Sequence, residues 1–372
     1  MAALEIVPWS EIYNVIKQGP KTILDVIDRN SNHFCSRLAS EEYVLGAYLF
    51  EEAIVSVQMF DGPKAFGSTL VSKRQLVNDI DRIVTKKISE TSTISHRDIN
   101  KSSVQYFIHP FLIETIAGAI VTHLVETLDY PHLSRFWGSF VCIEMEKSGI
   151  SLEKQVTVGY TISELEGEAL IDLPFVLERG PKYDSNENQV IPIIDEEHLI
   201  YVYLQILHTI DFLSKHGIVH LDLHLENIRI FIFSEEDAHM DYEYFGYIFD
   251  DGRAYSVANL GYIVRIIDWD ITRVDVGNTR YMNRYLQGQF FDVRYSILKF
   301  TIMMWERFGL CDNFLGNMMR WIRTTVRLNE NEPLLDEQTP DFTPSIWKQW
   351  FLESKLDQSA KRNTLIYKTQ EF

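Results

Sequence analysis

The stretch HLDLHLENIRI, residues 220–230, is the part of the sequence that decides the fold. Asp222 is followed five residues later by Asn227, and the apolar segment IRIFIF, residues 228–233, comes next. An acid and an amide on one short loop before a strand can orient an acceptor hydroxyl and supply an oxygen ligand to Mg²⁺. This spacing therefore predicts a loop that supports phosphoryl transfer.

A helix is predicted immediately before this loop, over residues 195–216. Asp195 can cap its N-terminus, and Gly217 has the position of a glycine that ends a helix. The apolar residues of one face recur with helical spacing: Leu199, Tyr203, Ile206, Leu207, Ile210 and Leu213. The segment GIVH, residues 217–220, then leads into the loop.

A second acid is expected at the end of a later strand. VRIIDWDITR, residues 264–273, provides Asp268 directly after an apolar run. The tripeptide His96-Arg97-Asp98 is of a kind that often marks the catalytic loop of a protein kinase. Here, however, Ser103 and not Asn stands five residues after Asp98. In addition, no amphipathic helix is predicted before the tripeptide and no apolar strand after it. We interpret HRDINKSS, residues 96–103, as a chance match in a solvated loop.

Strands are predicted early in the chain and helices late. The segments 53–60, 68–77 and 81–89 have strand composition, a helix opens at His109-Pro110, and two further strands follow at 136–145 and 173–180. A polar insertion at 147–172 separates those two strands, and helix returns from 290 to the end. Residues 1–40 look helical and separate from the rest. This order predicts an α+β fold with a small β-rich lobe and a larger, mostly helical lobe.

The composition fits an intracellular globular protein. Among the 372 residues, 35 Lys and Arg against 53 Asp and Glu give a net charge of −18. That balance disfavours direct binding to nucleic acid or an anionic membrane and is compatible with a basic partner. Three dispersed cysteines predict neither a disulfide framework nor a zinc cluster. The start has no signal-peptide pattern, and Glu114 and His123 interrupt the most apolar segment, so we expect no membrane association. We also expect a monomer.

These motifs together resemble a eukaryotic-type protein kinase, with most similarity to the haspin family of atypical Ser/Thr kinases. Four features carry the resemblance: Asp-Leu-His with His224 in the loop, Asp268-Trp269-Asp270 in place of Asp-Phe-Gly, an insertion with a hairpin-like stretch at 234–262, and FFDV without an Ala-Pro-Glu motif. It covers about residues 41–310. It implies a bilobal kinase-like fold with an extension at 1–40, an N-lobe at 41–178, a C-lobe at 179–372, and insertions at about 147–172 and 234–262.

The resemblance also implies ATP and Mg²⁺ and a role for each site residue. Asp222 would be the catalytic base, Asn227 and Asp268 the metal ligands, and Lys86 with Glu114 the pair that positions the phosphates; Lys87 is the competitor of Lys86. GPKAFGSTL, residues 62–70, resembles a Gly-rich phosphate loop in which Lys64 replaces the central glycine. The remaining implied residues are Gly62, Phe66 and Gly67 of that loop, Glu178 at the hinge that holds adenine, Asp292 at a helix start, and His220 as a structural residue. Leu221 stands where many kinases have Arg, so we expect activity without a phosphorylated activation loop.

The resemblance implies a basic protein substrate, such as a histone tail, and a nuclear location. One departure matters here, because only Asp275 among the residues between Thr272 and Phe291 is acidic. The acids lie instead in the 234–262 insertion, at Glu235, Glu236, Asp237, Asp241, Glu243, Asp250 and Asp251.

Two other interpretations of the function remain open. HLDLHLEN and IIDWD also resemble aminoglycoside and choline phosphotransferases, and the lost glycine at Lys64 would suit a pseudokinase scaffold.

Overall fold

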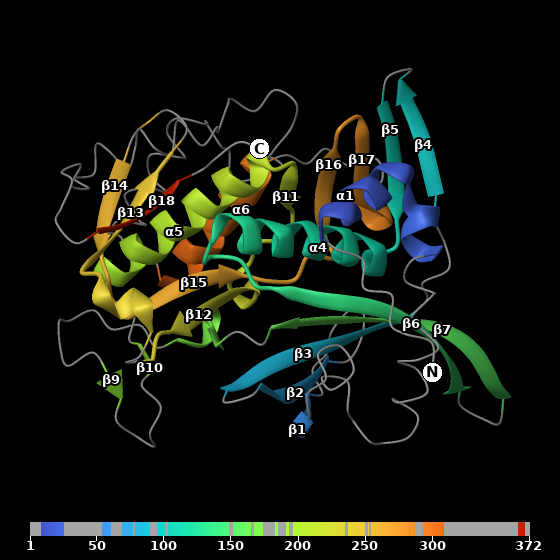
Figure 1. Ribbon diagram of the computed structural model, residues 1–372, viewed down its shortest axis with the longest axis horizontal. Coiled ribbons are helices and arrows are strands. Elements are labelled where there is room, and N and C mark those ends of the chain that lie inside the picture. Colours follow the sequence, from blue (N-terminus) through green and yellow to red (C-terminus); the bar gives the residue numbers. More distant parts are fainter. Residues whose placement is uncertain are drawn as a thin grey trace. The chain divides into compact units, whose positions relative to one another are not determined.

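The computed structural model consists of helices and strands, whose course along the chain is drawn in Figure 1. The chain divides into two units. Unit 1 comprises residues 1–166 and 268–287, and unit 2 comprises 167–267 and 288–372. Residues 268–287 therefore belong with the N-terminal part, although a single boundary near residue 178 was expected. The structure describes residues 9–25, 54–60, 69–76, 79–89, 95–100, 103–148, 152–164, 167–173, 183–184, 191–192, 196–234, 237–249, 252, 254–286, 293–308 and 364–368.

The first sheet of unit 1 is antiparallel, with strand order β1-β2-β3-β7-β6. The three predicted early strands are confirmed as β1 (Ile54–Phe60), β2 (Thr69–Leu76) and β3 (Asp79–Ser89). β1 and β2 flank the predicted phosphate loop, whose residues 61–68 lie outside the described part. The predicted strand at 136–145 is also present, as β6 (Phe136–Ser148).

The predicted polar insertion at 147–172 is wrong for most of its length. Residues Leu152–Glu164 form β7, which pairs with β6 on one side and β3 on the other. Its composition is misleading because two of its buried residues, Gly159 and Thr161, are small or polar. They are two residues apart and therefore lie on the same face of the sheet.

Helix α4 (Pro110–Leu128) packs against β6 and β7 at very short range. Pro110 occupies the first turn, as the sequence predicts. The side chain of His109 caps the helix by accepting a hydrogen bond from the Phe111 amide. Gly159 lies against the Phe111 ring and Gly118 against Phe136. α4 is long and apolar enough to cross a membrane, but 72 % of its most apolar window is buried in the protein, which is the pattern of a core helix.

We expect Gly159→Ala to destabilise unit 1 because the new Cβ would clash with the ring of Phe111, which is fully buried. Overpacking of this kind costs about 1–3 kcal/mol. Chemical denaturation should show this loss, whereas Ser163→Ala on the same strand should change stability by less than about 0.5 kcal/mol. Adding Phe111→Leu should recover part of the loss. A double variant no more stable than the sum of its two single changes would contradict the contact.

A second sheet of unit 1 contains β16 (Thr272–Val276), β17 (Thr279–Asn283), β5 (Ser103–Ile108) and β4 (Ser95–Asn100), in that order. β17 and β5 pair in parallel. The tripeptide His96-Arg97-Asp98 therefore belongs to a strand of this sheet, and the expected solvated loop is wrong. An apolar strand does follow Asp98: it is β5, in which Phe107 and Ile108 are buried. β5 pairs with β4 in the antiparallel direction and so fixes β4 in the sheet.

The N-terminal helix α1 (Trp9–Gln18) is part of unit 1 and not a separate extension. It packs against α4 and β16. Tyr281 of β17 donates its hydroxyl hydrogen bond to the carbonyl of Ile16 and stacks on Tyr106 of β5 at 5.4 Å between ring centroids. Burial raises the pKa of the Tyr281 hydroxyl, which therefore stays protonated as a donor.

Unit 2 is built on helix α5 (Glu196–Lys215), which matches the helix predicted at 195–216. All six residues of its predicted apolar face are buried, and Gly217 ends it with φ of 74°. Next come β11 (Ile218–His220), the 3₁₀ turn η2 (Leu225–Asn227) and β12 (Ile228–Ile232). β12 pairs with β15 (Tyr262–Ile266) and with β8 (Glu168–Ala169), beside the turn η1 (Leu170–Asp172). A second helix, α6 (Val293–Phe308), contacts α5 and β11.

The predicted hairpin in the 234–262 insertion is confirmed. It consists of the turn η3 (Ala238–Asp241), β13 (Tyr244–Ile248) and β14 (Ala254–Ala258). The expectation of helix from 290 to the end is confirmed for α6 and wrong for residues 364–368, because β18 (Thr364–Lys368) pairs in parallel with β13. The remaining elements of unit 2 are the short pair β9 (Tyr183–Asp184) and β10 (Ile191–Pro192). In unit 1, η4 (Arg284–Leu286) follows β17.

Candidate active site

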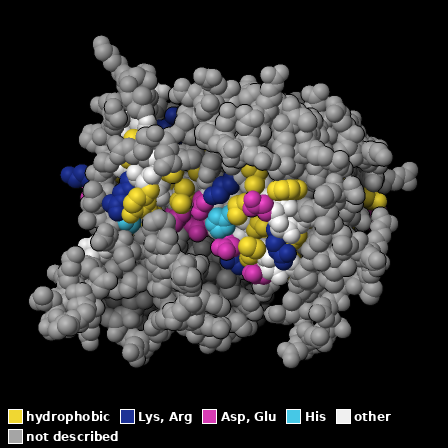
Figure 2. Space-filling view, turned by 180° about the vertical axis from the view of Figure 1, so that it is seen from behind, with side chains coloured by type: hydrophobic (Ala, Val, Ile, Leu, Met, Phe, Trp, Pro, Cys, Tyr) yellow, Lys and Arg dark blue, Asp and Glu magenta, His cyan; other side chains and the backbone are white. Residues whose placement is uncertain are grey.

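The loop between β11 and β12 alternates apolar and polar residues, and this pattern fixes which side chains reach solvent. Leu221, Leu223 and Leu225 are buried, with exposures of 3 %, 0 % and 2 %, while Asp222 and His224 between them are only half-buried. The leucines therefore anchor the loop in the apolar core of unit 2. As a result, Asp222 and His224 are presented outward. On one face of the molecule, acidic, basic and histidine side chains reach the surface close together (Figure 2).

Backbone and side-chain hydrogen bonds hold this loop in one conformation. Nδ2 of Asn227 donates to the carbonyl of Asp222 at 3.1 Å. His220 is buried, and its Nδ1 accepts from the Asp222 amide at 3.3 Å, so its Nε2 is the donor toward the carbonyl of Ile267 at 3.0 Å. Ser296 of α6 donates to the carbonyl of His220. His220 thus has the structural role predicted for it.

Each carboxylate oxygen of Asp222 has a different partner. Nζ of Lys299, on α6, donates to Oδ1 at 2.5 Å, and Nε2 of His224 lies 3.5 Å from Oδ2. Burial by itself would raise the pKa of Asp222, but the hydrogen bonds from His224 and Lys299 and the positive charge of Lys299 hold it well below its ordinary value. Asp222 is therefore a carboxylate at neutral pH, the form that can accept a proton.

The residue before Asp268 is tied to this same loop. The amide of Ile267 donates to the carbonyl of Asn227 at 3.0 Å, and its carbonyl accepts from His220. β15 ends one residue earlier, at Ile266, which pairs with Ile228. The prediction that Asp268 follows the end of an apolar strand is thus confirmed. Asp268 itself has φ of 67°, a left-handed conformation that Asp tolerates better than most residues.

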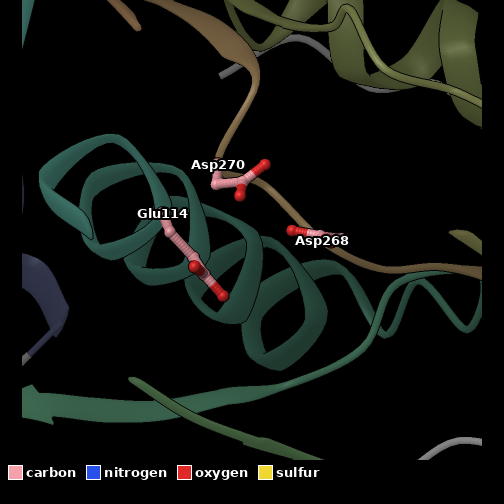
Figure 3. Close-up of side chains that lie close together, drawn as sticks. All are labelled: Glu114, Asp268 and Asp270. Carbon is pink, nitrogen blue, oxygen red and sulfur yellow. The ribbon is translucent and has the colours of Figure 1, made fainter. Parts of the chain in front are cut away.

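Unit 1 contains a cluster of three acids, formed by Glu114 of α4 with Asp268 and Asp270 (Figure 3). One carboxylate oxygen from each lies within 4.8 Å of the other two. Glu114 and Asp270 are buried, with exposures of 6 % and 5 %, and Asp268 is half-buried. Oxygen ligands at this spacing suit a hard cation such as Mg²⁺. Glu114, predicted from its position in an apolar helix face, is therefore brought to Asp268.

Asp270 was not predicted as a site residue. Nδ2 of the Asn283 side chain donates to the backbone carbonyl of Asp270 at 2.6 Å and so fixes the segment before β16. Sequence reasoning treated Trp269-Asp270 only as a departure from the kinase pattern. Trp269 is buried, with 4 % exposure. Asp270 is buried beside it, with 5 % exposure, and no pattern in the sequence marks this acid as part of a cluster.

The position of Lys86 is described through its backbone. Lys86 on β3 is paired with Thr69 of β2 and with Thr161 of β7, whereas Lys87 is paired with Tyr160. Thr161 donates its hydroxyl hydrogen bond to Oε1 of Glu114 at 3.1 Å. Lys86, and not Lys87, is therefore the residue of β3 that is paired with Thr161, the β7 residue that contacts Glu114.

The other predicted site residues lie outside the described part of the chain: Gly62, Phe66, Gly67, Glu178 and Asp292. Sequence reasoning missed Lys299. It lies 77 residues from Asp222, as a single lysine in the sequence FFDVRYSILKF, and neither spacing nor composition distinguishes it from a surface lysine.

Comparison with known proteins gives no family for this chain. No family model and no curated protein matches it. Among the solved structures that match is the MAP kinase LmaMPK10 of Leishmania major, with 14 % sequence identity, a TM-score of 0.36, and coverage of 89 % of this chain and 76 % of that chain. A TM-score below 0.5 does not establish a common fold, so a kinase assignment depends on the residues described above.

Proposed function

We propose that the chain is an ATP-dependent serine/threonine protein kinase of the haspin-like type. The observation that carries this proposal is the Asp222 loop: a carboxylate with a lowered pKa, presented outward, on the same rigid loop as Asn227. The backbone of Ile267 is bonded to this loop, and the next residue in the chain is Asp268. An acid, an amide and a second acid arranged in this order are the parts that phosphoryl transfer from ATP needs.

In the proposed reaction, Asp222 orients the acceptor hydroxyl of a Ser or Thr. The hydroxyl oxygen forms a new bond to the γ-phosphorus of ATP, and the bond from that phosphorus to the bridging oxygen breaks, so that ADP leaves with the electron pair. The hydroxyl proton passes to the Asp222 carboxylate. A lowered pKa suits a residue that mainly positions the hydroxyl, since a loose transition state needs little proton removal before the phosphorus–oxygen bond forms.

The residues for a divalent cation fit Mg²⁺. We propose Asp268 and Asn227 as its ligands. Within unit 1, Glu114 and Asp270 offer further carboxylates close to Asp268. Within unit 2, Asn227 donates from Nδ2 to the Asp222 carbonyl, so its Oδ1 is the atom proposed as the ligand. When bound, Mg²⁺ neutralises charge on the phosphate oxygens. For the chain itself, this means that Asp268 and Asn227 must be held rigidly, which the hydrogen bonds of Ile267 and Asp222 support.

We further propose that Lys86 positions the phosphates of ATP and that Glu114 is its partner. The register of β3 against β7 supports Lys86 over Lys87, because residues directly opposite in an antiparallel pair share a face of the sheet. Glu114 is already held from the sheet side by Thr161. Glu114 and Asp270 of the acid cluster are buried, and a lysine ammonium group near them would favour their charged form.

A basic protein substrate, a nuclear location and a monomeric state belong to this proposal. The net charge of −18 favours a basic peptide, and a histone tail is the example that the haspin resemblance suggests. The described acids of the hairpin insertion support it in part. Asp241 and Glu243 are exposed, whereas Asp237 is half-buried and contacts His239 at 2.6 Å.

The purified chain should transfer labelled phosphate from ATP, with Mg²⁺, to Ser or Thr of basic peptides. The test compares histone-tail peptides, acidic peptides, aminoglycosides and choline in parallel, with EDTA as the control that removes Mg²⁺. Label on an aminoglycoside or choline, and not on peptides, would support the small-molecule phosphotransferase instead. A protein that neither transfers phosphate nor gains thermal stability from ATP and Mg²⁺ would be a scaffold.

A further inference from the structure

The loop that carries Asp222 contains no strong cation of its own. Between His220 and Asn227 there is neither Lys nor Arg, and the side chains that can carry charge beside Asp222 are His224 and Glu226. Phosphoryl transfer places a group with spread negative charge next to the Asp222 carboxylate. The Asp222 carboxylate and the adjacent phosphoryl group are both negatively charged and repel each other. A cation close to both would offset this repulsion.

We propose that Lys299 is that cation, a catalytic residue whose ammonium group contacts the transferring phosphoryl group. This inference rests on the kinase function proposed above. Lys299 reaches the loop from α6, and its Nζ lies 2.5 Å from Oδ1 of Asp222. The contact places a full positive charge at the acid that orients the acceptor hydroxyl.

The geometry leaves Lys299 able to bind a second anion. An ammonium group has three N–H donors, and Asp222 takes one of them. The side chains of Lys299 and Asp222 are each 27 % exposed, so the pair reaches solvent where a substrate could approach. His224 contacts the other oxygen of the carboxylate, Oδ2, at 3.5 Å, and so leaves the Lys299 side of Asp222 unobstructed by the imidazole.

Helix α6 holds Lys299 in a fixed position relative to the Asp222 loop. α6 contacts β11 and the η2 turn, and Ser296, one helical turn before Lys299, donates to the carbonyl of His220. The ammonium group is thus held by the same helix that holds the start of the loop. During transfer the ammonium group stabilises the charge on the phosphoryl oxygens, while the proton of the acceptor hydroxyl goes to Asp222.

Lys299→Gln separates this role from a purely structural one. Glutamine can still donate a hydrogen bond to Asp222 but has no charge. If Lys299 contacts the phosphoryl group, kcat should fall about 10²-fold, as for loss of one stabilising donor, while KM for ATP changes only a few-fold. Lys215→Gln is the matched control, because Lys215 pairs with Asp211 at 3.0 Å in the same unit and should leave kcat unchanged.

A relocated lysine provides the second measurement. Adding His224→Lys to Lys299→Gln puts an ammonium group on the other side of Asp222 and should restore kcat to within about tenfold of wild type, since one preorganised donor is being replaced by another. If Lys299→Gln retains wild-type kcat, or loses it without any recovery in the double variant, the proposal is overturned while the kinase function stands. If the wild-type protein transfers no phosphate, both fall together. Thermal unfolding of each variant shows that the fold is kept, and if Lys299→Gln does not fold, Lys299→Met with and without His224→Lys takes its place.

Discussion

Asp222→Asn should lower kcat for phosphoryl transfer by about 10³-fold, within the range that a positioned acid–base group contributes. Asparagine keeps the shape of the side chain and can still accept from Lys299, so the loop should keep its conformation. It cannot accept the proton of the acceptor hydroxyl. The variant should bind ATP as well as wild type or more tightly, because a negative charge near the phosphates is removed.

Glu226→Gln is the matched control for this experiment. Glu226 is an exposed acid on the same loop, four residues away, and its amide variant should transfer phosphate at the wild-type rate. Quantitative transfer assays and ATP titrations on the two variants separate chemistry from binding. Transfer by Asp222→Asn within about threefold of wild type would reject Asp222 as the residue that receives the proton.

Asp268→Asn should abolish the dependence of nucleotide binding on Mg²⁺ and lower kcat by about 10²- to 10³-fold, since a metal ligand supports several kcal/mol of transition-state stabilisation. Asn is the right replacement because Asp268 has φ of 67°, and Asn adopts this conformation readily whereas Ala would be strained. Thermal unfolding with ATP, with and without Mg²⁺, reports the binding.

Asp129→Asn controls for the backbone conformation at this position. Asp129 is an exposed acid with φ of 50° at the C-terminal end of α4, so the same substitution is made in the same kind of conformation but away from the acid cluster. It should leave both nucleotide binding and transfer unchanged. An Asp268→Asn protein that still gains Mg²⁺-dependent stability from ATP would remove Asp268 from the metal site.

The parts of the fold with a strong local pattern could be predicted from the sequence. α5 follows from six apolar residues at helical spacing and the terminal Gly217, and β12 and β15 follow from short β-branched runs. β7 was missed because its buried positions include Gly159 and Thr161, which are small or polar, and close packing against α4 selects such residues. β4 was missed because an edge strand of polar residues resembles a loop until its partner is known.

The candidate site divides in the same way. Asp222, Asn227 and Asp268 stand next to strand ends, and a strand end has a sequence signature. Lys299 and Asp270 have none, because their relation to the site depends on contacts across 77 residues in one case and on a buried turn in the other. β18 belongs with them: its pairing with β13 joins residues about 120 positions apart, and no local pattern specifies a partner at that distance.

The discontinuity of unit 1 has a consequence for how the polypeptide folds during synthesis. Residues 268–287 supply β16 and β17, without which β5 has an unpaired edge and Tyr106 has no stacking partner in Tyr281. The first 166 residues therefore lack two strands of their second sheet until about a hundred further residues have been translated. A truncated chain ending near residue 166 would expose a bare strand edge and is expected to aggregate, so chaperone demand should be concentrated in that interval.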